Sequence, residues 1–199
     1  MNRKYIIYIT TGLFIISSLL FVGCSSKVAD AKTNTQTTQT ASAQTQDNQI
    51  ETYFTKKDGN LDKILIKEIN TAQKTLDVAI YSLTKEDIAN AIIDAKKKGI
   101  DVKIITDKQE SQTKAQKAIL DKFKANNIPV KINSHSGLMH LKLSVIDDKT
   151  ALGGSYNYTA NATKENDENL IVMRESNIVS EYASEFNTMW ADTNNYSNY

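Results

Sequence analysis

The chain has 199 residues and a formal net charge of +1, with 40% hydrophobic and 24% charged residues, which is ordinary usage for a globular protein. The near-zero net charge excludes a general electrostatic attraction to nucleic acid, so any affinity for phosphate must come from a few placed groups. A single cysteine, Cys24, excludes a disulfide within the chain.

The N-terminus has the pattern of an export signal. Arg3 and Lys4 precede an almost wholly apolar run over residues 6–22, and Cys24 follows in a group of small residues. This order resembles the signal of bacterial lipoproteins, which implies that Cys24 becomes the lipidated N-terminus and anchors the chain in the membrane. We predict a lipoprotein-type signal peptide over residues 1–23, with an uncleaved membrane helix and ordinary secretion as the alternatives. In each case the following domain lies outside the cytoplasmic membrane, and an anchored form is attached to its outer face.

A polar segment follows the signal. Residues 24–49 are dominated by Thr, Gln, Ser, Ala and Asn, and such a composition buries too little apolar surface to offset the entropy of ordering. We predict a flexible tether over residues 24–49 and one folded domain over residues 50–199.

Helical and strand patterns alternate through the first half of this domain. Apolar residues at helical spacing predict a helix over residues 61–72. The predicted strands after it are residues 76–83, 100–106 and 129–132. Between them we predict a helix capped at Thr84 and ended by Gly99, and a helix over residues 112–125. Such a β-α-β-α-β order implies right-handed crossovers and parallel strands covered by helices.

The second half of the domain has a different pattern. Residues 140–147 and 150–153 predict a hairpin that turns at Asp148 and Lys149, and residues 168–173 predict another strand. Ser176 is the expected cap of a final helix, whose apolar stripe we interpret as core packing (Ile178, Tyr182, Phe186 and Met189). The expected fold class is therefore α/β, with a mixed, mostly parallel sheet flanked by helices on both faces.

The residues with the clearest chemistry lie in the first strand of the predicted hairpin. Side chains alternate between faces along a strand, so His140, Lys142 and Ser144 are expected on one face and Leu141 and its apolar neighbours on the other. An imidazole beside a fixed ammonium suits a phosphate oxyanion, because the lysine neutralises charge while the histidine attacks or transfers a proton.

Further polar groups follow the hairpin. Gly153 and Gly154 allow the backbone to approach a ligand closely, and Ser155 and Asn157 offer a hydroxyl and an amide to the same oxyanion. Glu168 offers a carboxylate that could hold the second nitrogen of an imidazole and fix its tautomer. A lone His-x-Lys or Gly-Ser pair is usually without functional meaning. Both patterns together, in this order and at this spacing, rarely occur by chance and therefore indicate a functional site.

These residues resemble a known pattern. They resemble the full HKD motif of the phospholipase D superfamily, which is matched by His140, Lys142, Asp147, Gly154, Ser155 and Asn157. The chain is most similar to the small bacterial endonucleases of that superfamily, which carry one motif per chain. The similarity covers residues 50–190, which include the stretch Ala79–Thr84. The resemblance implies a phospholipase D-like catalytic domain.

The resemblance also implies a mechanism. In this superfamily the motif histidine attacks phosphorus and forms a phosphohistidine, and a histidine of a second motif protonates the leaving oxygen. One motif per chain implies a homodimer in which two copies of His140 share the active site. Lys142 and Asn157 are expected to bind phosphate oxygens, Ser155 to add a hydrogen bond and Glu168 to orient the imidazole. The motif aspartate, Asp147, is expected to be more structural than chemical, and no metal or cofactor is implied.

Other candidates have simpler interpretations. We interpret His135 as a loop residue, and the lysines of residues 96–98 and 114–124 as a solvated helix surface rather than a contact to a nucleic-acid backbone. Tyr156 and Tyr158 are placed to stack on bases or to pack beside the motif. The sequence thus predicts a metal-independent phosphodiesterase acting on DNA or RNA, with a lipid-acting phospholipase D and a silent binding module as alternatives.

Overall fold

A computed structural model describes residues 49–199. The predicted signal peptide, Cys24 and almost all of the predicted tether lie outside the described residues. In chain order the elements are β1 (Ile50–Phe54), α1 (Thr55–Asp58), α2 (Leu61–Ile69), β2 (Thr75–Ile80), α3 (Glu86–Lys97), β3 (Asp101–Thr106), the 3₁₀ turn η1 (Glu110–Gln112), α4 (Lys114–Ala125), β4 (Val130–Asn133), β5 (Lys142–Ile146), β6 (Thr150–Gly154), α5 (Ala160–Lys164), β7 (Asn169–Met173), α6 (Ser176–Ala191) and β8 (Tyr196–Asn198).

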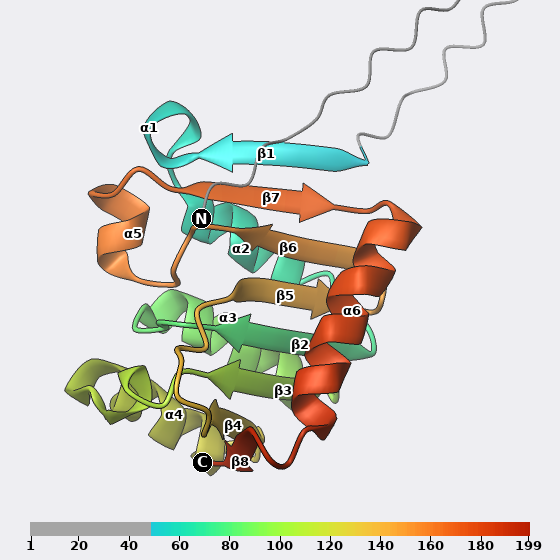
Figure 1. The fold of residues 1–199 in the computed structure, drawn as a ribbon. Helices are drawn as coiled ribbons and strands as arrows, with labels where there is room; N and C mark the ends of the chain where they lie inside the picture. Colours follow the sequence, from blue (N-terminus) through green and yellow to red (C-terminus); the bar gives the residue numbers. More distant parts are fainter. Residues whose placement is uncertain (1–48) are drawn as a thin grey trace, which may run out of the picture. The chain divides into compact units, whose positions relative to one another are not determined.

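The strands of the described region form one eight-stranded mixed sheet in the order β1-β7-β6-β5-β2-β3-β4-β8 (Figure 1). Strands β2, β3 and β4 run parallel, joined by α3 and α4 as expected. All other pairings in the sheet are antiparallel, so its parallel part is smaller than expected. One reason is that β5 and β6 are joined only by the short turn from Asp147 to Lys149, which antiparallel neighbours alone permit.

Helices cover both faces of this sheet, as predicted. Figure 1 shows α6 crossing one face alone, with α2, α3 and α4 on the other. Strand β2 contacts both layers, since Val78 packs into the core beneath α2, α3 and α4 and Ala79 packs into the core beneath α6. The predicted stripe on α6 does pack on the sheet, with Phe186 and Met189 fully buried.

Two predicted helix caps are wrong. Thr84 lies before α3, because its N–H and that of Lys85 donate to the carbonyl of Tyr158 in a neighbouring loop, and Lys85 is the N-cap residue. Ser176 is the first residue of α6, and Glu175 holds the N-cap position without a side-chain cap bond. The predicted turn between β5 and β6 is present, with Asp147 and Asp148 in the left-handed region at φ values of 54° and 53°.

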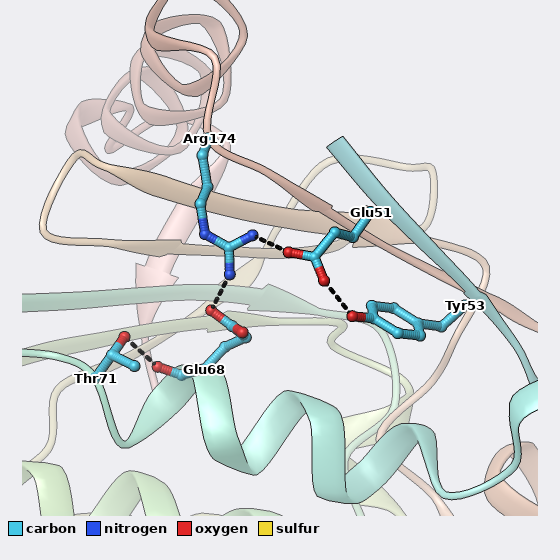
Figure 2. Close-up of polar contacts among 5 residues, drawn as sticks. All are labelled: Glu51, Tyr53, Glu68, Thr71 and Arg174. Carbon is cyan, nitrogen blue, oxygen red and sulfur yellow. Dashed lines mark hydrogen bonds and ion pairs between the residues drawn. The ribbon is translucent and has the colours of Figure 1, made fainter. Parts of the chain in front are cut away.

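A cluster of ion pairs that the sequence did not predict holds the outer strand β1 in place. Arg174 at the end of β7 donates to Glu51 Oε1 at 2.7 Å and to Glu68 Oε2 on α2 at 2.9 Å (Figure 2). Tyr53 donates a hydrogen bond to Glu51. One guanidinium therefore ties β1, β7 and α2 together.

Within residues 49–199, no helix is both long enough and apolar enough to cross a bilayer.

Candidate active site

His140 lies just before β5, beside the end of the central strand β2. The backbone N–H of Tyr81 donates to the carbonyl of Leu141 at 2.9 Å, which holds the segment before β5 against the residue that follows β2. The imidazole is exposed, and the Tyr81 ring lies 4.5 Å from it between centroids. The expectation that His140 lies within a strand is wrong, since β5 begins only at Lys142.

The structure brings Lys142 directly to His140. The Lys142 ammonium lies 3.0 Å from His140 Nδ1 and donates to the His140 carbonyl at 2.8 Å. It also lies 5.2 Å from the centre of the Tyr81 ring, which favours a cation there. Partial burial lowers the pKa of Lys142, and the negative charge of Glu168 opposes that effect. Ser144 does not join the pair, because its buried hydroxyl is paired with Tyr158 at 2.8 Å.

The second group of predicted residues follows β6, and a close backbone contact fixes it. Gly154 has a φ of +128°, and a Cβ there would lie 2.4 Å from the carbonyl oxygen of Asn169 on β7. Only glycine fits such a position. The Ser155 N–H next to it donates to the Asn169 side chain at 2.9 Å, so the double-glycine turn fixes the position of Ser155 at the edge of the site.

Glu168 holds Ser155 rather than His140. Its Oε2 accepts a hydrogen bond from the Ser155 hydroxyl, and its Oε1 accepts one from Asn166 at 3.0 Å. No hydrogen bond between Glu168 and His140 is present in the described part of the chain. Within one chain the Glu168 carboxylate therefore orients the Ser155 hydroxyl and raises the pKa of Lys142. The expected orientation of the imidazole by Glu168 stays a prediction.

Asn157 and Asp147 have different surroundings. The Asn157 Oδ1 is buried without a hydrogen-bond partner among residues 49–199, although the side chain as a whole is half-exposed. Asp147 lies at the far end of β5 from Lys142, and its carboxylate accepts three backbone N–H bonds at 2.7–2.9 Å from residues 73–75. Burial raises the pKa of Asp147, but these bonds outweigh burial and the net pKa is lowered. Its geometry is that of a structural clamp on the start of β2.

A cleft lies between the His140–Lys142 pair and α6. Its volume is about 420 Å³, and the residues that line it include Gly153, Tyr182, Glu181 and Glu185 besides the pair. A pocket of this size accommodates a small organic substituent. Tyr81 and Tyr182 were not predicted as site residues. Tyr81 had a detectable signal, since it directly follows a buried strand that ends beside the motif.

The remaining candidates fall outside the site. Tyr156 and Tyr158 are buried, with 1% of each exposed, so neither can stack on a base and packing is the correct interpretation. His135 accepts a hydrogen bond from the Gly137 N–H at 3.2 Å within its own loop. In the part of the chain that the structure describes, no three His, Cys, Asp or Glu side chains are grouped to hold a metal ion.

Comparison with known proteins agrees with this geometry. A family profile described as "Cardiolipin synthase, PLD-like domain" matches residues 65–190, which include both halves of the site. The chain belongs to this phospholipase D-like family.

Named relatives and one solved structure show how far the similarity extends. The phospholipase D-like chain is 33% identical over 133 residues to a phospholipase D of Rickettsia bellii, covering 67% of this chain and 65% of the relative. It is 30% identical over 122 residues to a mitochondrial cardiolipin hydrolase of Chlamydomonas reinhardtii, covering 61% and 54%. The match thus spans less than two thirds of either relative. The crystal structure of NUC, a phospholipase D family member from Salmonella typhimurium, superposes with a TM-score of 0.69 at 26% identity, covering 75% of this chain and 97% of NUC.

Proposed function

We propose that this protein is a metal-independent endonuclease that hydrolyses phosphodiester bonds of DNA or RNA through a phosphohistidine at His140. The observation that carries the proposal is the contact of 3.0 Å between the Lys142 ammonium and the His140 imidazole, at the solvent-exposed start of the central strand β5. The single motif and the match to 97% of the compact NUC chain support a small single-motif enzyme.

In the proposed reaction a nitrogen of His140 attacks the phosphorus and forms a P–N bond, while the bond to the leaving oxygen breaks. Lys142 neutralises the non-bridging oxygens as charge develops, and the amide of Asn157 adds donors there. The Ser155 hydroxyl adds a further donor once its hydrogen bond to Glu168 is exchanged for one to phosphate. Water then cleaves the P–N bond and regenerates the imidazole. The leaving oxygen requires a proton from a second imidazole, and we propose that His140 of the partner subunit in a homodimer donates it.

Cleavage assays on the purified full chain test the substrate and the metal requirement together. We would measure turnover of single-stranded DNA, RNA, a bis-aryl phosphodiester and phosphatidylcholine vesicles, all in EDTA, for wild type and His140→Ala. Nucleic-acid cleavage that persists in EDTA and is lost in His140→Ala is the expected result. Cleavage that EDTA abolishes would contradict the metal-free mechanism.

The shared active site has its own test. The molecular masses of wild type and of His140→Ala are measured by sedimentation, together with the turnover of each species. A dimeric mass is expected for every form, and a fully active monomer would contradict the shared site.

Phospholipid hydrolysis is the second candidate function, and a specific observation favours it. Leu138 and Leu141 flank His140 with 46% and 39% of their surfaces exposed, and such apolar side chains beside a nucleophile suit contact with a lipid surface. Relatives named phospholipase D and cardiolipin hydrolase support the same candidate. The vesicle arm of the assay decides between the two, because a lipid enzyme would release a head group and leave DNA and RNA intact.

We also propose that the protein is exported and attached through lipidated Cys24 to the outer face of the bacterial cytoplasmic membrane. The basic start, apolar run and single cysteine of the sequence support this anchor. Labelling of cells with a radioactive fatty acid should mark the wild-type chain and leave Cys24→Ala unmarked. An unlabelled wild-type chain would contradict lipidation.

A further inference from the structure

His140 belongs to no helix or strand, yet the main chain is fixed on both sides of it. The N–H of Met139, one residue before, donates to Asp107 Oδ2 at 3.0 Å. The carbonyl of Leu141, one residue after, accepts from the N–H of Tyr81 at 2.9 Å. Two hydrogen bonds to the ends of β3 and β2 therefore set the position of the His140 backbone.

Asp107 is a rigid anchor for the first of these bonds. It directly follows β3 and is 1% exposed. Its other oxygen, Oδ1, accepts from the N–H groups of Gln109 at 2.8 Å and Glu110 at 3.1 Å, which lead into η1. The carboxylate has no salt-bridge partner among residues 49–199, so its charge is balanced by backbone donors alone. One oxygen thus holds its own loop, and the other holds the segment that carries His140.

A second side chain supports the same segment. Asn133, 2% exposed at the end of β4, accepts from the Lys108 N–H at 2.8 Å and donates to the Gly137 carbonyl at 2.8 Å. Residues 134–139 are therefore tied to the chain that follows β3 at two points, Gly137 and Met139. Parallel strands end at the same edge of a sheet, which is where this arrangement gathers the ends of β2, β3 and β4.

We propose that Asp107 is a positioning residue for His140, acting through the N–H of Met139. The inference rests on the proposed role of His140 but not on whether the phosphodiester belongs to nucleic acid or lipid. An attacking nitrogen must lie close to phosphorus and in line with the leaving oxygen, so a displacement of about 1 Å can lower the rate about a hundredfold. Nothing in the geometry gives Asp107 a contact with substrate.

Asp107→Asn tests the proposal with almost no change of shape. The amide oxygen is expected on the side of Gln109 and Glu110, where it accepts two bonds, which leaves an NH₂ group facing the N–H of Met139. Two donors then face each other, and the segment before His140 must move. The expected result is a fall in kcat of about tenfold to a hundredfold with KM changed less than about twofold.

Asp192→Asn is the matched control. Asp192 Oδ1 likewise accepts two backbone N–H groups, from Asn194 at 2.9 Å and Asn195 at 3.0 Å, but Oδ2 holds only the Asn195 side chain. The same substitution there keeps the turn and leaves His140 untouched, so kcat should stay within about twofold of wild type. Asp107→Ser is the second variant, because serine can still accept a bond in the turn while removing the acceptor for Met139 without adding a facing amide.

The assay uses the full-length chain and a bis-aryl phosphodiester in EDTA, with folding checked by thermal unfolding. A loss of kcat in every Asp107 variant that folds, with the control unaffected, supports the proposal. A folded variant with wild-type kcat, or a variant that loses only thermal stability, overturns it. His140→Ala is measured in parallel. If it keeps activity, the proposed function fails at His140, whereas an inactive His140→Ala beside fully active Asp107 variants rejects the positioning role alone.

Discussion

The Lys142 ammonium lies 3.0 Å from Nδ1 of His140 and donates to the carbonyl of the same residue at 2.8 Å. In the proposed reaction this lysine assists the same residue that holds it in place. In the proposed complex the ammonium lies next to the bound phosphate. Partial burial lowers the pKa of Lys142 below the ordinary 10.5. Lysine and nucleophile are therefore aligned by the backbone before a substrate arrives.

Replacement of this ammonium should impair the chemical step. Lys142→Gln keeps the length but removes the charge, and kcat should fall about a hundredfold, as expected for loss of one group that stabilises an oxyanion. Measurement is by phosphodiester turnover in EDTA, with exposed Lys97→Gln as the control that keeps full activity. Activity of Lys142→Gln within a few-fold of wild type would show that the ammonium does not act in the transition state.

Glu168→Gln should change the pH dependence of turnover. The carboxylate raises the pKa of Lys142 against the lowering effect of burial. Without that negative charge, Lys142 loses its proton at a lower pH, so the alkaline limb of the kcat/KM profile should move to lower pH. Lys142→Arg should move the same limb to higher pH, because a guanidinium stays charged throughout. If the alkaline limbs of the two variants do not shift in opposite directions, that limb does not report the deprotonation of Lys142.

The two glycines of the turn should respond differently to alanine. At Gly154 a Cβ would lie 2.4 Å from the Asn169 carbonyl at a φ of +128°, so Gly154→Ala should lower the free energy of unfolding by about 2–4 kcal/mol. At Gly153 the obstacle is the Tyr182 hydroxyl at 2.8 Å, which a side chain can move. Gly153→Ala should cost less, and its cost should shrink further in a Tyr182→Ala background. Urea unfolding of the four variants measures both effects, and equal costs at the two glycines would contradict the assignment.

The Arg174 cluster in Figure 2 should contribute to stability but not to catalysis. Arg174→Ala leaves the buried Glu68 carboxylate without its cation, and we expect a loss of about 2–3 kcal/mol in the free energy of unfolding. Lys117→Ala is the control, because the solvent-exposed pair of Lys117 and Asp121 should contribute little to stability. Equal losses in the two variants, measured by urea unfolding, would show that burial of Glu68 has no special effect.

The sequence predicted the central elements and the contact between His140 and Lys142 for a physical reason. Strands β2 and β3 are rich in apolar residues, and the spacing of His140, Lys142, Ser155 and Asn157 is local along the chain. The antiparallel pairing of β5 with β2 was not predictable from local patterns, because it joins segments that are far apart in the chain. The edge strand β8 has only three residues, too few to give a periodic signal.

Asp107 and Glu168 show a second limit. A carboxylate directly after a strand is visible in the sequence, but its partners are not. Asp107 contacts Met139 across 32 residues, and Glu168 contacts Ser155 rather than the expected imidazole. Hydrogen bonds between distant segments depend on side-chain geometry that no local pattern encodes.

The most direct test of the proposed function is the mass of the peptide that carries His140 during turnover. The full-length chain is mixed with a single-stranded oligonucleotide in EDTA, quenched at short times under conditions that preserve P–N bonds, and analysed by mass spectrometry. We predict a nucleotide adduct on His140 that forms and decays at rates compatible with turnover. Turnover with His140 unmodified at every time, and undiminished in His140→Ala, would contradict a phosphohistidine enzyme.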